Sequence, residues 1–204
     1  MKLNLPNKLT IARLVLVPVI LVLTILPYSI LTNVLALVVF IGASLTDMFD
    51  GKIARKRGLI TDFGKFLDPL ADKFMVIAAI FGLVCRGYQQ KNDVLFWVFM
   101  AMLIVTIFRE LAVASIRLVA STSGGVVVAA NMLGKLKTVF QMICIIAALA
   151  EPVIFDVIGR LAGEPVTFGY YPVAYLSAAI AVVLTVWSGV NYLAAYWKFL
   201  DPEK

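Results

Sequence analysis

The stretch SLTDMFDGKIARKRGLITDFGKFLDPLADK, residues 44–73, joins two apolar segments through a short basic turn. It carries four aspartates at helical spacing, two on each side of that turn: Asp47, Asp50, Asp68 and Asp72. An ionised carboxylate at a membrane helix is costly unless positive charge compensates it. We therefore expect this stretch to form a hairpin of two membrane helices, with the compensating charge supplied at a functional site.

The rest of the chain has the composition of a membrane protein. Of its 204 residues, 62% are hydrophobic, and the mean hydropathy is +0.99; soluble domains contain about 45–50% apolar residues. Apolar segments of about the length that crosses a bilayer lie at roughly 11–28, 31–53, 64–84, 94–117, 134–156 and 172–197. We expect an all-α integral membrane protein of six transmembrane helices, a single membrane domain over residues 1–204, with residues 1–10 as a short interfacial segment.

Lysine and arginine are unevenly divided between the two sides of this arrangement. Of the 18 lysine and arginine residues, all but Arg86, Lys91 and Arg160 fall on the side that holds both termini and residues 44–73. Because cytoplasmic loops are enriched in these residues, that side is expected to face the cytoplasm. The net charge of +6 favours anionic partners, membrane lipids first, and a chain this apolar is not expected to bind nucleic acid.

The four aspartates can converge on one site. Asp47 and Asp50 lie about 60° apart on one helix, and Gly64, Asp68 and Asp72 share a face of the next at spacings of four. Carboxylates suit hard divalent cations such as Mg²⁺, Mn²⁺ or Ca²⁺. The chain has no histidine, and its two cysteines have no metal-type spacing. The pattern predicts a metal site, for which two ions are a natural arrangement.

Small and basic residues beside the aspartates indicate the ligand. Gly51 and Gly64 would let a bulky anion approach the backbone, and Arg55 can pair with a phosphate. Together with metal ions these residues predict a diphosphate site at the membrane surface. Without histidine, a general base is expected to be a carboxylate.

The pattern Asp47-x-x-Asp50-Gly51-x-x-Ala54-Arg55, followed after eight residues by Gly64-x-x-x-Asp68-x-x-x-Asp72, resembles the signature of the CDP-alcohol phosphotransferase family. The resemblance implies a metal-dependent enzyme, often homodimeric, in which an alcohol displaces CMP from a CDP-linked donor. It implies that Asp47, Asp50, Asp68 and Asp72 hold two Mg²⁺ or Mn²⁺ ions, and that Asp72 also takes the proton of the acceptor hydroxyl. It places the cytidine diphosphate at Asp50, Gly51, Arg55 and Gly64.

Residues 6–13, 108–121 and 131–142 further resemble bacterial members of the family that use CDP-diacylglycerol as donor and sn-glycerol 3-phosphate as acceptor. This implies a multi-pass protein of the bacterial cytoplasmic membrane with its active site facing the cytoplasm. Donor phosphates are then expected at Asn7, Thr10 and Arg13, although Asn7 and Thr10 would equally well cap a helix.

Four cations at the cytoplasmic ends of the fourth and fifth spans favour an anionic acceptor: Arg109, Arg117, Lys135 and Lys137. A phosphate monoester needs such a pocket, whereas choline or ethanolamine would be repelled. Glu110 is expected to hold one of these arginines in place. Basic residues at these helix ends are equally expected as topology determinants and lipid contacts.

Other functions fit the chain less well. The same family with another acceptor, of the cardiolipin type or inositol phosphate, stays open. A membrane prenyltransferase would have more helices and more widely separated acidic motifs. A divalent-cation transporter would hold its acids nearer the midplane, and the basic run 55–57 would hinder cation entry.

Overall fold

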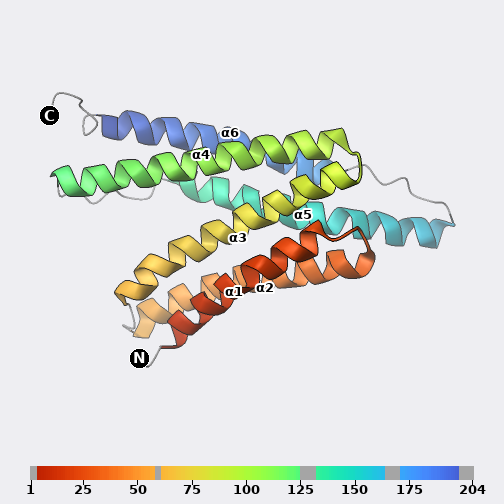
Figure 1. Cartoon of the computed structure of the whole chain (residues 1–204), viewed down its shortest axis with the longest axis horizontal. Coiled ribbons are helices and arrows are strands. Elements are labelled where there is room, and N and C mark those ends of the chain that lie inside the picture. Colours follow the sequence, from red (N-terminus) through yellow and green to blue (C-terminus); the bar gives the residue numbers. More distant parts are fainter. Residues whose placement is uncertain (1–3, 58–60, 125–131, 164–170, 198–204) are drawn as a thin grey trace.

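The computed structural model describes the backbone of residues 4–57, 61–124, 132–163 and 171–197, and their side chains except those of 47–57 and 121–124. This part of the chain is all-helical, with no strand (Figure 1). Its helices, each coinciding with one expected span, are α1 (Leu5–Ile25), α2 (Ile30–Arg57), α3 (Asp62–Gln89), α4 (Asp93–Gly124), α5 (Met132–Ala162) and α6 (Pro172–Tyr196). The expectation of an all-α protein is confirmed.

Length and composition make this a membrane protein. Within the described residues, four segments are long and apolar enough to cross a bilayer, namely Leu5–Ile25, Asp93–Ala120, Met132–Ala162 and Pro172–Tyr196, and Ile30–Thr46 is a shorter apolar helix. Helix α3 is long enough but carries more charge, including Asp68, Asp72 and Lys73. These charged residues lie in the first half of the helix, and its second half, from Phe74 to Cys85, is apolar.

The first helix begins at Leu5, earlier than the expected residue 11. The Asn4 side chain caps it by accepting a hydrogen bond from the Asn7 backbone N–H at 3.0 Å, and a proline stands in the first turn, where its fixed φ and missing N–H are tolerated. Residues 5–10 therefore continue α1 instead of lying flat as a separate segment. Residues 1–3 of the expected interfacial segment lie outside the described part.

The helices form two groups that meet along α3. Helix α1 packs on α2 and α3, helix α6 packs on α4 and α5, and contacts of α3 with α4 and of α2 with α5 join the groups. The start of α1, the end of α2, the start of α3 and the end of α4 lie at one end of the bundle, at the left of Figure 1. We call this the motif end, because α2 and α3 carry the aspartate motif there.

Besides a small cluster of Val113, Ile116 and Tyr192 in the later parts of α4 and α6, the main hydrophobic core occupies the half of the bundle away from the motif end. Its fully buried members include Ala79, Leu83, Phe99, Ala148 and Ala178 from four helices. Alanines at these contacts let the helix backbones approach closely, as is usual in membrane bundles. The packed half holds the helices together and leaves the motif end free to carry polar side chains.

Arg86 lies inside this packed half, although the expected span ends near residue 84 and leaves Arg86 outside it. Helix α3 continues to Gln89, so that Arg86 is only 1% exposed. Its Nη1 donates to Asn33 Oδ1 of α2 at 2.5 Å, and Asn33 Nδ2 donates to the Leu149 carbonyl of α5 at 3.3 Å. These hydrogen bonds offset the cost of burying the guanidinium and tie three helices together.

Candidate active site

Asp68, one of the predicted metal ligands, is held from another helix. Its Oδ1 accepts a hydrogen bond from Thr10 Oγ1 of α1 at 2.5 Å. Thr10 is 1% exposed and lies inside α1, so it does not cap that helix. The contact places a residue predicted to touch the donor directly beside a predicted metal ligand.

Gly64 lies at the start of α3, directly beside α1. The Thr61 hydroxyl caps α3 by accepting from the Gly64 N–H at 3.0 Å, and it donates to Asn7 Oδ1 at 3.1 Å. A Cβ at Gly64 would stand 3.0 Å from Asn7 Oδ1 and 3.3 Å from Thr61 Oγ1. The missing side chain thus serves the packing of α1 on α3, a role that sequence reasoning did not assign to this glycine.

Arg13 follows Thr10 by one turn of α1 and is completely buried. With Asn7 and Thr10 it shares the face of α1 whose hydroxyl and amide contact α3. The structure therefore brings Asn7 and Thr10 to the motif helix and buries Arg13 inside the bundle, one turn further along α1.

The remaining motif residues lie on the last turns of α2. Asp47, Asp50, Gly51 and Arg55 belong to that helix by backbone, and their side chains fall outside the described residues. Among the side chains that are described, no group of three or more His, Cys, Asp or Glu residues comes together. Of the four predicted carboxylate ligands, the described side chains thus include only those of Asp68 and Asp72, which lie one turn apart on α3.

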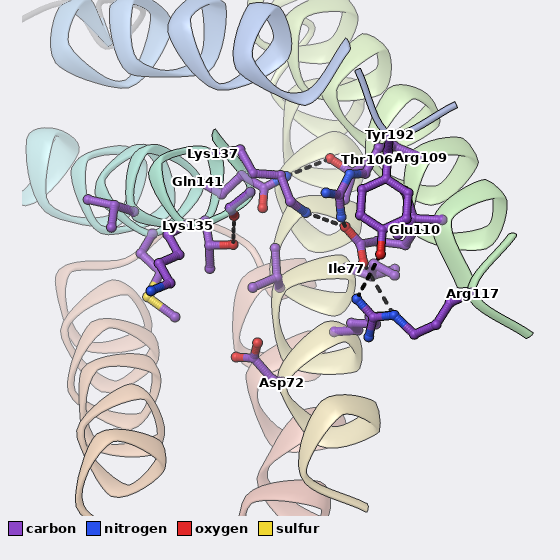
Figure 2. A pocket seen from close by; sticks show the side chains of 17 residues that line it. Asp72, Ile77, Thr106, Arg109, Glu110, Arg117, Lys135, Lys137, Gln141 and Tyr192 are labelled. Atoms are coloured by element: carbon purple, nitrogen blue, oxygen red, sulfur yellow. Dashed lines mark hydrogen bonds and ion pairs between the residues drawn. The ribbon is translucent and has the colours of Figure 1, made fainter. Parts of the chain in front are cut away.

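A cavity of about 490 Å³ opens between α3, α4, α5 and α6 (Figure 2). Its volume is typical of small-molecule sites. It is lined by the predicted base together with all four predicted acceptor cations: Asp72, Arg109, Arg117, Lys135 and Lys137. Three helices thus bring to one cavity residues that are up to 65 positions apart in the sequence.

Glu110 is the centre of the charged cluster in this cavity. Its Oε1 accepts from Arg109 Nη1 at 2.9 Å and from Lys137 Nζ, and its Oε2 pairs with Lys73 Nζ at 3.3 Å. The expectation that Glu110 holds one arginine is met by Arg109. Lys73 was not predicted to belong to the site. Its position directly after Asp72 was the one signal in the sequence that could have indicated it.

Helix α6 supplies polar partners that sequence reasoning did not identify. Ser188 Oγ accepts a hydrogen bond from Arg109 Nε at 3.2 Å, and Tyr192 Oη accepts one from Arg117 Nη2 at 3.4 Å. Both α6 residues are buried. They lie in an apolar helix, and their role as partners of the two arginines is visible only once α6 packs against α4.

Figure 2 shows how the cavity is divided. Arg109, Glu110 and Lys137 lie close together, whereas Asp72 stands apart from them on α3 and Lys135 reaches a different part of the wall. The cavity thus combines a cluster of cations that suits a phosphate with a separate carboxylate that can accept a proton. This arrangement can bind a small anionic alcohol and activate its hydroxyl group.

Comparison with known proteins gives a consistent result. The model of the CDP-alcohol phosphatidyltransferase family matches residues 3–187. The chain is 40% identical over 211 residues to a CDP-diacylglycerol–glycerol-3-phosphate 3-phosphatidyltransferase of Bacillus subtilis (strain 168), with 98% of each chain covered. It is 37% identical to a protein of the same name from Wigglesworthia glossinidia brevipalpis, again with 98% of each chain covered. It is also 37% identical to a probable phosphatidylglycerophosphate synthase of Mycobacterium tuberculosis (strain CDC 1551 / Oshkosh), with 94% of this chain and 80% of the relative covered.

Proposed function

The chain belongs to the CDP-alcohol phosphatidyltransferase family, and from that premise we propose that it transfers a phosphatidyl group from CDP-diacylglycerol to sn-glycerol 3-phosphate. The products are phosphatidylglycerophosphate and CMP, which makes the protein an enzyme of phospholipid synthesis. Relatives that cover nearly its whole length carry these two substrates in their names.

One observation carries the choice of acceptor. The cavity beside Asp72 is lined by five cations, Lys73, Arg109, Arg117, Lys135 and Lys137. A phosphate monoester near neutral pH carries roughly −1.5 to −2 charges and three strong acceptor oxygens. Such an acceptor gains charge-assisted hydrogen bonds in this cavity, whereas a neutral or cationic alcohol would leave the cations uncompensated.

The motif residues fit the family's use of divalent metal ions. Asp68 and Asp72 follow each other by one turn on α3, the Thr10 hydroxyl orients Asp68, and the donor set consists of oxygen atoms alone. We assign two Mg²⁺ or Mn²⁺ ions to Asp47, Asp50, Asp68 and Asp72. When bound, such ions neutralise the diphosphate of the donor and the charge on the departing CMP.

The protein's own side chains then have separate tasks. Arg13 and Arg55, with Asn7, Thr10, Gly51 and Gly64, hold the diphosphate of the donor. The cations of the cavity bind the phosphate of sn-glycerol 3-phosphate and direct its free hydroxyl towards the donor. Asp72 takes the hydroxyl proton while the hydroxyl oxygen bonds to the lipid-side phosphorus. The bond from that phosphorus to the bridging oxygen breaks, and CMP leaves with the electron pair.

The setting of this reaction follows from the charge distribution. The basic residues gather at the motif end, so we place that end on the cytoplasmic face of a bacterial cytoplasmic membrane. Residues 1–204 form one domain in this proposal, in contact with membrane lipids and paired as a homodimer.

The test is an acceptor comparison with the purified protein. CDP-diacylglycerol and Mg²⁺ or Mn²⁺ are incubated with sn-glycerol 3-phosphate, inositol phosphate, phosphatidylglycerol, serine or no acceptor. CMP and the lipid product are followed by mass spectrometry. We expect CMP release with sn-glycerol 3-phosphate alone, and its loss in Asp72→Asn.

Each other outcome has a defined meaning. Release of CMP with a different acceptor would keep the family chemistry and reject sn-glycerol 3-phosphate. No release with any acceptor, from protein that is folded by circular dichroism, would reject phosphatidyl transfer altogether.

A further inference from the structure

Glu110 joins three helices through one carboxylate. Its partners are Lys73 of α3, Arg109 of α4 and Lys137 of α5. The Glu110 side chain is 11% exposed and that of Lys137 only 7%. The pairs of Glu110 with Arg109 and Lys137 are therefore weakly screened by salt and water, whereas Lys73, with a side chain that is 40% exposed, joins them from the more open side.

Two of the cations share a single oxygen atom. Arg109 Nη1 and Lys137 Nζ both donate to Glu110 Oε1. Two like charges that close together repel each other unless a negative charge lies between them. The carboxylate therefore holds these two cations side by side in the cavity.

The charge of the cluster matches the proposed acceptor. Three cations and one carboxylate leave about two positive charges uncompensated, and a phosphate monoester carries about two negative charges at neutral pH. A cation array that is already assembled spares the acceptor the cost of ordering it. Lys73 extends this effect, since it follows Asp72 directly on α3 and links that helix to Glu110.

We propose that Glu110 is a positioning residue for acceptor binding. Its carboxylate holds Lys73, Arg109 and Lys137 in the array that receives the acceptor's phosphate, and through Lys73 it keeps the Asp72 segment of α3 beside that array. This inference rests on the proposed function, because it assumes that the cavity binds a phosphate-bearing alcohol.

Two other roles of Glu110, competition with the phosphate and a purely structural role, would change the kinetics in different ways. A carboxylate that merely competed with phosphate for the cations would weaken acceptor binding, and its neutralisation would lower the KM for the acceptor. A carboxylate needed only for folding would affect both substrates, or the amount of folded protein, without preference. Kinetics that separate the two substrates therefore distinguish these roles.

The experiment measures steady-state kinetics of the full-length protein and of Glu110→Gln with CDP-diacylglycerol and sn-glycerol 3-phosphate. The amide has the shape of the carboxylate without its charge. We expect the KM for the acceptor to rise by roughly tenfold or more, as for loss of charge-assisted hydrogen bonds, and the KM for the donor to stay unchanged. Competitive inhibition by inorganic phosphate, which probes the cations without the alcohol, should weaken in parallel.

Two further variants control the result. Glu110→Asp keeps the charge on a shorter side chain and should restore part of the acceptor affinity. Asp156→Asn removes a carboxylate whose side chain is similarly buried, 15% exposed. Asp156 pairs with Arg160 at 3.1 Å near the end of α5, in the half of that helix that does not contain Lys137. We expect Asp156→Asn to leave both KM values and the phosphate inhibition unchanged.

The inference would be overturned by an unchanged or lowered acceptor KM in Glu110→Gln, or by equal rises in both KM values. If Glu110→Gln does not fold, Glu110→Asp is judged by the same criteria. A wild-type protein that releases no CMP with sn-glycerol 3-phosphate would overturn the proposed function and this inference with it. A working wild type with an unaffected Glu110→Gln would overturn this inference alone.

Discussion

Thr10 and Asp68 are 58 residues apart in the sequence and hydrogen-bonded in the structure. The contact joins the beginning of α1 to the motif helix α3 at the point where a metal ligand is expected. A hydroxyl that donates to a carboxylate fixes which way the carboxylate oxygens point. The first helix, which is long and apolar enough to cross a membrane, therefore also takes part in shaping the candidate site.

Thr10→Val should weaken metal use without unfolding the protein. Valine keeps the shape of threonine and removes the hydroxyl, and a hydrogen bond to a charged group is worth roughly 1.5–3 kcal/mol. We expect about tenfold or greater loss of activity at limiting metal, part of which excess Mg²⁺ or Mn²⁺ restores. The measurement is CMP release across a metal titration.

Thr24→Val is the matched control for this substitution. Thr24 is also buried in α1, but its hydroxyl donates to the Ile20 carbonyl of its own helix at 2.8 Å. We expect its metal dependence to equal that of the wild type. Identical metal curves for both variants and the wild type would contradict a role for Thr10 at Asp68.

Removal of metal should stop the reaction and leave the fold intact. The hydrophobic core lies in the half of the bundle away from the motif end, so the helices do not depend on the metal ligands for their packing. We expect a chelator, and equally Asp68→Ala, to abolish CMP release while the helical circular dichroism persists. Full activity of Asp68→Ala would reject the metal site, and unfolding by the chelator would give the metal a structural role instead.

Arg109→Lys should not preserve function, although it preserves charge. Arg109 uses Nη1 for Glu110 and Nε for Ser188, and a lysine ammonium cannot reproduce that fork. We expect the acceptor KM to rise by roughly tenfold, with the donor KM unchanged. Arg160→Lys, which changes an exposed arginine of α5, is the control and should behave as the wild type. Equal kinetics for Arg109→Lys and the wild type would place Arg109 outside acceptor binding.

Gly87→Ala should destabilise the protein at the turn from α3 to α4. A Cβ there would stand 2.6 Å from the Phe96 backbone nitrogen and 2.8 Å from its Cα, and a backbone cannot move aside as a flexible side chain does. Overpacking of this kind costs about 1–3 kcal/mol. The expected result is a lower midpoint of thermal unfolding in detergent.

Gly42→Ala provides the comparison for that substitution. Nothing lies within 4 Å of a Cβ at Gly42 in α2, so alanine should be tolerated or stabilise the helix by about 0.5–1 kcal/mol. Equal unfolding midpoints for Gly87→Ala and Gly42→Ala would show that α4 does not approach α3 as closely as the structure indicates.

Some of the site could be predicted because it is local in the sequence. Asp68 and Asp72 are four residues apart, so they share a face in any helix that contains both. The apolar segments that are long enough to cross a bilayer predict the helices directly. Four cations were predicted to bind the acceptor from their positions at helix ends, and the structure brings all four to one cavity. Periodicity and charge are properties of a single segment, so they can be predicted from the sequence without knowledge of the tertiary structure.

Other parts required the packing of helices against one another. Ser188 and Tyr192 look like ordinary polar residues of an apolar helix, and only the contact of α6 with α4 turns them towards Arg109 and Arg117. Arg86 was expected outside the span that ends near residue 84, but it is buried, and Asn33 of α2 accepts its hydrogen bond.

The sequence by itself determined the helices, the spacing of the aspartates and the sign of the charge at each helix end, since these depend on backbone periodicity and residue chemistry. Tertiary structure alone decided which cations share Glu110, and that Thr10 meets Asp68. Those pairings depend on how helices that are distant in the sequence are oriented and packed against one another. No single segment contains that information.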